Sequence, residues 1–184
     1  MTDPNKQILL DGRSVKRALA RMARELVEHV GGVENLALIG IHRRGVDLAA
    51  WLAREIERDE GVKVATGSLD ITLYRDDLMA IGPRPVVGET RLPPEGIEGK
   101  VVAIVDDVLF TGRTVRAALD ELTDFGRPRR ILLCVLVDRG GRELPIHADI
   151  VGKRYTVEDG DRVEVMVPDV DGQFGVALVK GALG

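Results

Sequence analysis

The chain is poor in cysteine, histidine and aromatic residues. Of its 184 residues, one is cysteine, three are histidine and 3% are aromatic. A single cysteine excludes a disulfide framework. Because Cys134 lies in the apolar run 131–137, we expect an unreactive core thiol. His29, His42 and His147 lack metal-ligand spacing, so no zinc site is predicted. So few aromatic residues also predict no interleaved stacking surface for nucleic-acid bases.

The sequence also lacks a long apolar run, a secretory pattern in its first residues and a strong net charge. No apolar stretch approaches the roughly 20 residues of a membrane span, and the first residues show no secretory pattern. We therefore expect a cytoplasmic protein without a membrane partner. A net charge of −4 argues against indiscriminate nucleic-acid binding. Without a repeat or a linker, residues 1–184 are expected to form a single domain.

Helical and extended patterns alternate along the chain. Apolar residues spaced three and four apart predict helices over 14–30, 46–58 and 113–125. Apolar runs predict strands over 35–41, 64–74, 100–106 and 130–137, with shorter signals at 150–152, 163–167 and 176–180. This order predicts an α/β fold with a mainly parallel sheet flanked by helices. The proline-rich segment 75–99 predicts a lid, which with the preceding strand end spans about 70–99.

The segment 102–114 (VAIVDDVLFTGRT) is the most informative part of the chain. An apolar run ends in Asp106 and Asp107, and a Thr-Gly-Arg-Thr turn then precedes a helical pattern. Backbone N–H groups at a helix N-terminus bind phosphate, and Gly112 permits close approach. The two carboxylates can accept from ribose hydroxyls and hold Mg²⁺ directly or through water. A capped polar strand end is the alternative, but it makes poor use of two acids after a buried strand.

Basic segments fall near this motif in the predicted fold. Arg43, Arg44 and Gly45 follow a predicted strand and can present cations and amides to an anion, although such turns are also common on surfaces. Arg75 stands where the chain leaves the next strand. It can reach the same anion when the lid closes, or belong to a solvated hairpin.

Charge is also unevenly distributed along the sequence. Residues 13–24 hold five cations and no acid, whereas residues 155–172 hold six acids and one cation. At about 100° per residue, one helix face collects Arg13, Arg17, Arg21 and Arg24. This stripe suits phosphates, but a solvated helix face is an equal alternative.

The segment 102–114 resembles the phosphoribosyl pyrophosphate (PRPP) motif of the type I phosphoribosyltransferases. The resemblance implies that family's fold, with a flexible lid, and PRPP binding by Val102, Ala103, Ile104, Val105, Asp106, Asp107, Val108, Leu109, Phe110, Thr111, Gly112, Arg113 and Thr114. It implies catalytic roles for Asp106, Asp107 and Arg75, with Mg²⁺ at the acid pair. Pyrophosphate would then lie against Arg43, Arg44 and Gly45.

Three further segments make the similarity more specific. With LDITLYRDDL (69–78), FGRPRRI (125–131) and RELPIHADIVGK (142–153), the chain is similar over about 13–153 to the branch that attenuates pyrimidine operons. This implies transfer of phosphoribose from PRPP to uracil, giving UMP and pyrophosphate. It also implies binding of a pyrimidine-operon mRNA leader when UMP or UTP occupies the site, by a homodimer or a higher homo-oligomer.

The same resemblance implies contacts for the base and the RNA. The base would sit against Val151 and Gly152, with Arg139 nearby. RNA contacts would come from Arg13, Arg17, Arg21, Arg24, Arg142 and Lys153. Some purine-using relatives have an aspartate where this chain has Phe110, so no general base is assigned.

The chain departs from that branch at Ala20, Arg24 and Gly141 and in the acidic stretch 155–172. These differences fall on the implied RNA surface and leave the PRPP motif intact. A uracil phosphoribosyltransferase without the RNA role is therefore an alternative, and a phosphoribosyltransferase for another base is a second one.

Overall fold

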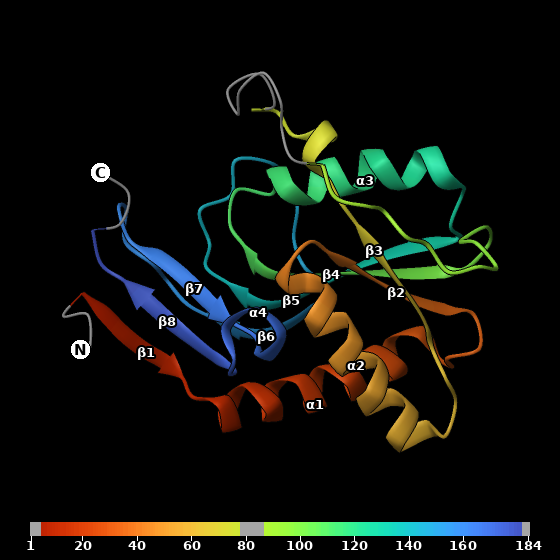
Figure 1. The fold of residues 1–184 in the computed structure, drawn as a ribbon, viewed down its shortest axis with the longest axis horizontal. Helices are drawn as coiled ribbons and strands as arrows, with labels where there is room; N and C mark the ends of the chain where they lie inside the picture. Colours follow the sequence, from red (N-terminus) through yellow and green to blue (C-terminus); the bar gives the residue numbers. More distant parts are fainter. Residues whose placement is uncertain (1–4, 78–86, 182–184) are drawn as a thin grey trace.

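The computed structural model describes residues 5–77 and 87–181, which form two sheets and their covering helices (Figure 1). The elements in chain order are β1 (Lys6–Leu10), α1 (Gly12–Val30), β2 (Leu36–Ile41), α2 (Arg44–Glu60), β3 (Ala65–Leu69), η1 (Thr72–Tyr74), β4 (Val101–Leu109), α3 (Arg113–Phe125), β5 (Arg130–Asp138), β6 (Ile150–Arg154), β7 (Arg162–Met166), α4 (Pro168–Asp171) and β8 (Gly175–Val179). The predicted α/β class is confirmed. Part of the predicted lid, 78–86, lies outside the described residues.

The larger sheet has five strands in the order β3-β2-β4-β5-β6, all parallel. From β2 the chain adds β3 on one side and β4 on the other. The strand order therefore reverses between β2 and β4. In open parallel sheets, ligands bind beyond the carboxyl ends of the strands at such a reversal.

Side chains alternate between the two faces of this sheet. Leu38 and Ala103 pack in the core beneath α1 and α2, whereas Ile39 and Ile104 pack in the core beneath α3. Figure 1 shows α3 on one face and α1 and α2 on the other. Because both faces are covered, the central strands read as continuous apolar runs. Cys134 is fully buried in this sheet, and burial raises the pKa of its thiol.

The first helix has a capped N-terminus and one buried face, as the spacing of its apolar residues predicts. Asp11 caps α1 by accepting a hydrogen bond from the Ser14 backbone N–H at 2.7 Å. Val15, Leu19 and Leu26 then lie buried on its core face. None of the described helices is long and apolar enough to cross a bilayer.

Two strand boundaries differ from the prediction. The strand predicted over 64–74 ends at Leu69, and a turn of 3-10 helix follows at Thr72–Tyr74. The strand predicted to end at Asp106 continues to Leu109, because β5 goes on pairing with it as far as Leu109 opposite Asp138. The acid pair is therefore inside β4 rather than at its tip.

The sequence signals at 163–167 and 176–180 do not extend the parallel sheet. They form β7 and β8, which pair antiparallel with each other and with β1. The strand Lys6–Leu10 was not predicted, because its half-exposed pattern carries little signal. The resulting three-stranded sheet lies at one end of the larger sheet (Figure 1).

Candidate active site

A cavity of about 630 Å³ opens where the strand order reverses. Its lining comes from the ends of β2 and β4, the start of α2 and α3, and the segment after β3. The lining residues are Ile41, His42, Arg43, Arg44, Asp70, Ile71, Thr72, Arg75, Gly88, Asp106, Asp107, Val108 and Thr114. The structure thus brings together three of the predicted segments: the Arg-Arg-Gly turn, Arg75 and the acid pair.

The cavity exists because β2 leaves the sheet before β4 does. The last pair between them is Gly40 opposite Val105, whereas β4 stays paired with β5 for four more residues. Gly45 packs against this uncovered edge, where a Cβ would lie only 2.4 Å from the Val105 carbonyl oxygen. Glycine at this position therefore lets the start of α2 lie directly against the strand that carries the acids.

The two acids of β4 differ in their surroundings. Asp106 is 7% exposed, and its Oδ1 accepts from the Asp107 backbone N–H at 2.9 Å. Asp107 is half-buried, and its Oδ1 accepts from the Val108 N–H at 2.8 Å. Burial, followed by the neighbouring charge of Asp107, raises the pKa of Asp106. The pair is therefore a concentrated acceptor site at the wall of the cavity.

The turn between β2 and α2 supplies positive charge on the opposite wall. The His42–Arg43 peptide is cis, and α2 begins at Arg44 without a side-chain cap from any described residue. Its first N–H groups and the helix dipole favour an anion. Arg43 is exposed and has no ion pair within residues 5–77 and 87–181. Arg44 is held by Asp171, with Nε and Nη2 contacts of 3.1 and 3.0 Å.

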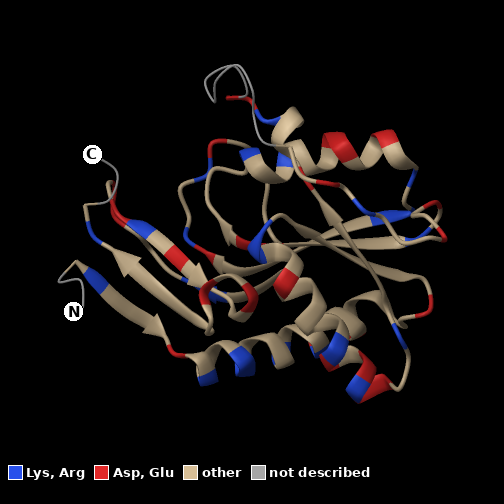
Figure 2. Cartoon of the chain, in the orientation of Figure 1, with Lys and Arg blue, Asp and Glu red and all other residues tan. Residues whose placement is uncertain are grey.

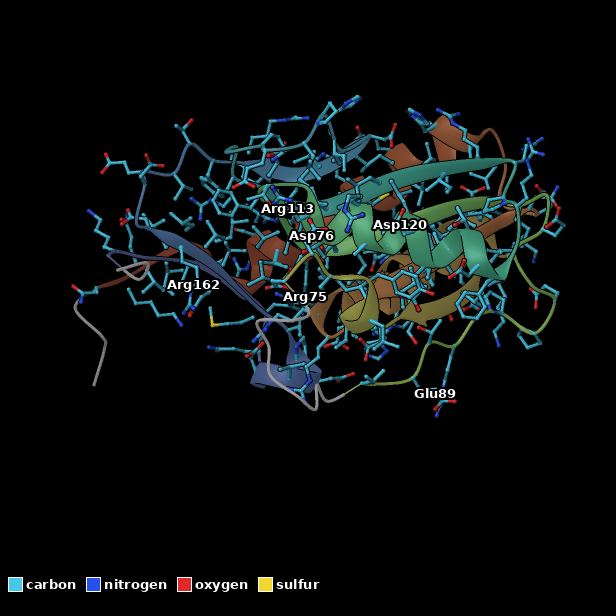
Figure 3. All side chains as sticks on the ribbon, turned by 90° about the horizontal axis from the view of Figure 1, so that it is seen from above. Arg75, Asp76, Glu89, Arg113, Asp120 and Arg162 are labelled. Atoms are coloured by element: carbon cyan, nitrogen blue, oxygen red, sulfur yellow. The ribbon has the colours of Figure 1, made fainter. Side chains whose placement is uncertain are left out.

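The Thr-Gly-Arg-Thr loop forms a second anion-binding feature next to the acids. Gly112 has φ +93°, and α3 starts at Arg113, whose backbone N–H donates to Thr111 Oγ1 at 3.3 Å. The side chain of Arg113 binds Asp76 at 2.8 Å and Glu143 at 2.7 Å, and Figure 3 shows Asp76 and Arg113 together at the start of α3. The loop therefore has backbone N–H groups and threonine hydroxyls for a ligand, while the Arg113 side chain is paired with Asp76 and Glu143.

Arg75 lines the cavity from the segment after β3, but it is engaged. Its guanidinium makes two contacts of 2.8 Å with Asp77, and this hydrogen-bonded pairing raises the pKa of Arg75. Arg75, Asp76 and Asp77 also border a smaller cavity of about 230 Å³ beside Thr111 and Thr114. The predicted lid residue is therefore next to the Thr-Gly-Arg-Thr loop in this structure.

The predicted base contacts lie away from the cavity lining. Arg139 is 6% exposed, stacks 3.8 Å from the Phe110 ring centre and donates to the Asp161 carbonyl at 2.9 Å. Val151 is buried in the core, and Arg21 donates to its carbonyl at 3.2 Å and to that of Gly152. Their role in base binding stays a prediction.

The predicted RNA contacts are divided between different surroundings. Arg13, Arg17 and Arg24 line a groove of about 930 Å³ beside α1 and α2. Arg21 turns to β6, as described above, and Lys153 is exposed on that strand. Arg142 holds the loop after β5, because it donates to the Phe110 and Ile146 carbonyls at 2.8 Å each and pairs with Asp138 at 2.7 Å. RNA binding by this set stays a prediction.

A second hollow beside the cavity was not predicted from the sequence. A hollow of about 600 Å³ adjoins the cavity, shares Arg44 and Asp107 with it, and is otherwise lined from the smaller sheet and α4. Those lining residues are Lys6, Arg162, Val163, Glu164, Val165, Met166 and Asp171. The sequence signals in this region were a short strand over 163–167 and the acidic character of residues 155–172, and neither predicts contact with Arg44 or Asp107.

Comparison with known proteins agrees with this geometry. The phosphoribosyl transferase domain family matches residues 5–165. A solved hypoxanthine phosphoribosyltransferase of Trypanosoma cruzi superimposes with a TM-score of 0.70 at 20% identity, covering 95% of this chain and 96% of that chain. The corresponding enzyme of Staphylococcus aureus has a TM-score of 0.68 at 20% identity, covering 95% and 92%. At such identities these structures support the fold alone.

The chain belongs to the phosphoribosyltransferase family and is a phosphoribosyltransferase. Within that family its relatives include the bifunctional protein PyrR of Thermus aquaticus, 56% identical over 94% of this chain and 95% of that protein. The PyrR proteins of Roseiflexus sp. and Chloroflexus aurantiacus are 53% and 51% identical over 95% and 97% of this chain, and over the same shares of those proteins. The branch predicted from the sequence motifs is thereby confirmed.

Proposed function

We propose that this protein transfers phosphoribose from PRPP to uracil and also regulates pyrimidine-operon mRNA. One observation carries the first function. Asp106 and Asp107 line the same cavity as the N-terminal residues of α2 and α3. The similarity to PyrR proteins supports the choice of uracil and of RNA. A cytoplasmic location fits both roles.

In the proposed complex, the ribose, the 5′-phosphate and the pyrophosphate of PRPP each contact a different wall of the cavity. The carboxylates of Asp106 and Asp107 accept from the ribose 2′- and 3′-hydroxyls. The 5′-phosphate takes the N–H groups and hydroxyls of 111–114, and the pyrophosphate lies against Arg43 and Arg44. Breaking the bond to C1′ moves negative charge onto the leaving pyrophosphate, where these cations and the α2 dipole stabilise it.

Arg75 adds to this stabilisation only after leaving Asp77. When the lid closes, Arg75 would exchange Asp77 for the departing pyrophosphate, which carries more negative charge than one carboxylate. Closure also excludes water from an electrophilic C1′. The predicted catalytic role of Arg75 is proposed on this basis.

The acid pair suits Mg²⁺ carried by the substrate. Among the described residues, no group of three or more metal-ligating side chains is found, so a closed protein cage is not available there. Mg²⁺ commonly keeps several waters and uses one or two carboxylates plus substrate phosphates, which Asp106 and Asp107 can supply. When bound, the ion would neutralise pyrophosphate charge.

The position of uracil has two candidates. One is the predicted set of Val151, Gly152 and Arg139. The other is the hollow beside Arg44 and Asp107, to which Arg162 contributes. Arg162→Gln should raise the KM for uracil with little change in the KM for PRPP if the second position is used. Phe110 offers no proton acceptor, so no general base is proposed.

Product formation tests the enzyme function. The protein is incubated with PRPP, Mg²⁺ and a panel of bases, and we expect UMP and pyrophosphate with uracil. Turnover of another base instead would indicate a different phosphoribosyltransferase. Binding of UMP without any turnover would contradict the enzyme function.

RNA binding is proposed for the groove that holds Arg13, Arg17 and Arg24, in a homodimer or a larger homo-oligomer. Its test is the affinity for a pyrimidine-operon leader RNA with and without UMP or UTP, measured across salt concentrations. We expect tighter binding with the nucleotide. Equal affinity for an unrelated RNA, unaffected by UMP, would leave the alternative of an enzyme without the RNA role. Sedimentation of the protein measures the assembly.

A further inference from the structure

One groove of the described chain lies apart from the cavity of about 630 Å³ and shares no lining residue with it. It is the groove of about 930 Å³ beside α1 and α2, closed at one side by the segment around α4. Five cations line it, Arg13, Lys16, Arg17, Arg24 and Arg58, against one acid, Glu55. Figure 2 shows basic residues along the outer side of α1. The groove is therefore a positive surface on a protein whose net charge is −4.

Part of that charge is available to a ligand. Arg24 pairs with Asp59 at 3.3 Å, and Arg58 pairs with Glu55 at 2.6 Å. Arg13, Lys16 and Arg17 are exposed, and none of them has an ion pair with any residue that the structure describes. Exposed cations without acid partners exchange only water and small ions for a phosphate.

The floor of the groove holds the only tryptophan of the chain, Trp51. It is half-buried on α2, and Phe174 supports it edge-on, with ring centres 5.0 Å apart. Two cations lie over the Trp51 ring, with Lys16 Nζ 5.5 Å and Arg54 Cζ 4.8 Å from the ring centre. A nucleobase can take the place of the exposed Lys16 side chain on the ring, and the displaced cation and its neighbours can then hold the phosphates.

We propose that Trp51 is a stacking platform for an unpaired base of bound RNA, with Arg13, Lys16 and Arg17 holding the adjoining phosphates. The proposal rests on the proposed RNA function and assigns it a position. No stacking surface was predicted from the sequence, because one tryptophan on the second helix and basic residues on the first meet only in the fold. A membrane surface or a second copy of the chain would use the same groove differently, and the test below separates them.

Fluorescence of the single tryptophan reports directly on this position. Titration with single-stranded leader RNA in the presence of UMP should quench it. A fully paired RNA duplex and inorganic polyphosphate should leave it unquenched, since neither offers an open base. A change with protein concentration alone, or with anionic vesicles but not RNA, would overturn the proposal.

Substitutions separate stacking from charge. Trp51→Leu keeps an apolar side chain against Phe174 but cannot stack, so RNA affinity should fall about tenfold. Trp51→Phe should retain more of it, and Phe125→Leu, an exposed aromatic on α3, should retain it all. Circular dichroism checks that each variant is folded. Leader binding that is equal in wild type and Trp51→Leu, without quenching, would refute the stacking while leaving the RNA function intact.

Two double variants test whether the cations of this groove bind the RNA phosphates. Arg13→Gln with Arg17→Gln should weaken binding and reduce its salt dependence, whereas Arg127→Gln with Arg129→Gln, exposed beyond α3, should not. Equal losses in both would show that only overall charge matters, which overturns the assignment to this groove. Absence of leader binding by the wild type would contradict the RNA function itself.

Discussion

Arg44 and Asp171 form a bidentate ion pair that ties the start of α2 to α4. The two contacts measure 3.1 and 3.0 Å, and the Asp171 carboxylate also accepts from the Val167 backbone N–H at 2.9 Å. One wall of the cavity of about 630 Å³ is thereby fixed to the segment between β7 and β8 of the smaller sheet. The pair also fixes Arg44 at the boundary between the two hollows.

The first prediction concerns the pH dependence of this pair. Its hydrogen bond with Arg44 is the main cause that holds the pKa of Asp171 below its ordinary value. A carboxylate with a lowered folded-state pKa stabilises the fold at pH values above its ordinary pKa of about 4. This stabilisation is lost as the pH falls from there through the lowered folded-state pKa. Asp171→Asn should therefore cost about 1 kcal/mol at pH 7, since the pair is partly exposed.

Denaturant unfolding at several pH values measures this. The difference between wild type and Asp171→Asn should disappear at low pH, while Asp159→Asn, exposed in the same acidic stretch, should show little difference at any pH. A constant difference down to strongly acid pH would contradict the ion pair as its cause.

The second prediction has the opposite sign. Burial and the charge of Asp107 raise the pKa of Asp106, so the ionised form opposes folding. This penalty is absent below the ordinary carboxyl pKa and grows as the pH rises through the raised folded-state pKa. Asp106→Asn should therefore be more stable than wild type at pH 7 and equal to it at low pH, although less active. Lower stability of the variant at pH 7 would exclude this account.

The third prediction concerns Gly45. A Cβ there would lie 2.4 Å from the Val105 carbonyl oxygen, so Gly45→Ala must push α2 away from β4. We expect a loss of about 1–3 kcal/mol and a raised KM for PRPP. Gly61→Asn at the other end of α2, where nothing lies within 4 Å of the added atom, is the control. Unchanged PRPP kinetics in Gly45→Ala would argue against a role of this helix start in pyrophosphate binding.

The fourth prediction separates structure from RNA contact at Arg142. Its guanidinium joins two backbone carbonyls and Asp138, so Arg142→Gln should lower the free energy of unfolding by about 1–3 kcal/mol. Arg142→Lys should rescue only part, since an ammonium lacks the planar fork. A selective loss of RNA affinity with unchanged stability would instead support the direct RNA contact predicted from sequence.

The sequence predicted the site best where chemistry is local. Asp106, Asp107 and the following Thr-Gly-Arg-Thr turn are contiguous, and the buried strand before them has a plain pattern. Their confinement to one cavity with Arg43 and Arg75 follows from parallel topology, which alternating strands and helices already predict.

What sequence could not supply depends on long-range pairing. The continuation of β4 past the acids is set by its partner β5, and the smaller sheet joins residues from both ends of the chain. Arg44 meeting Asp171, and Trp51 meeting Phe174 and Lys16, are products of that assembly. Neither pairing leaves a periodic signal in the sequence.

The most direct test of the proposed site is the uracil assay on Asp107→Asn. With PRPP, uracil and Mg²⁺, we expect UMP formation by wild type and a loss in kcat/KM on the order of 100-fold in the variant. Asp120→Asn on the outer surface of α3, labelled in Figure 3, should match wild type. Equal activity of wild type and Asp107→Asn would contradict the role of the acid pair in holding the ribose.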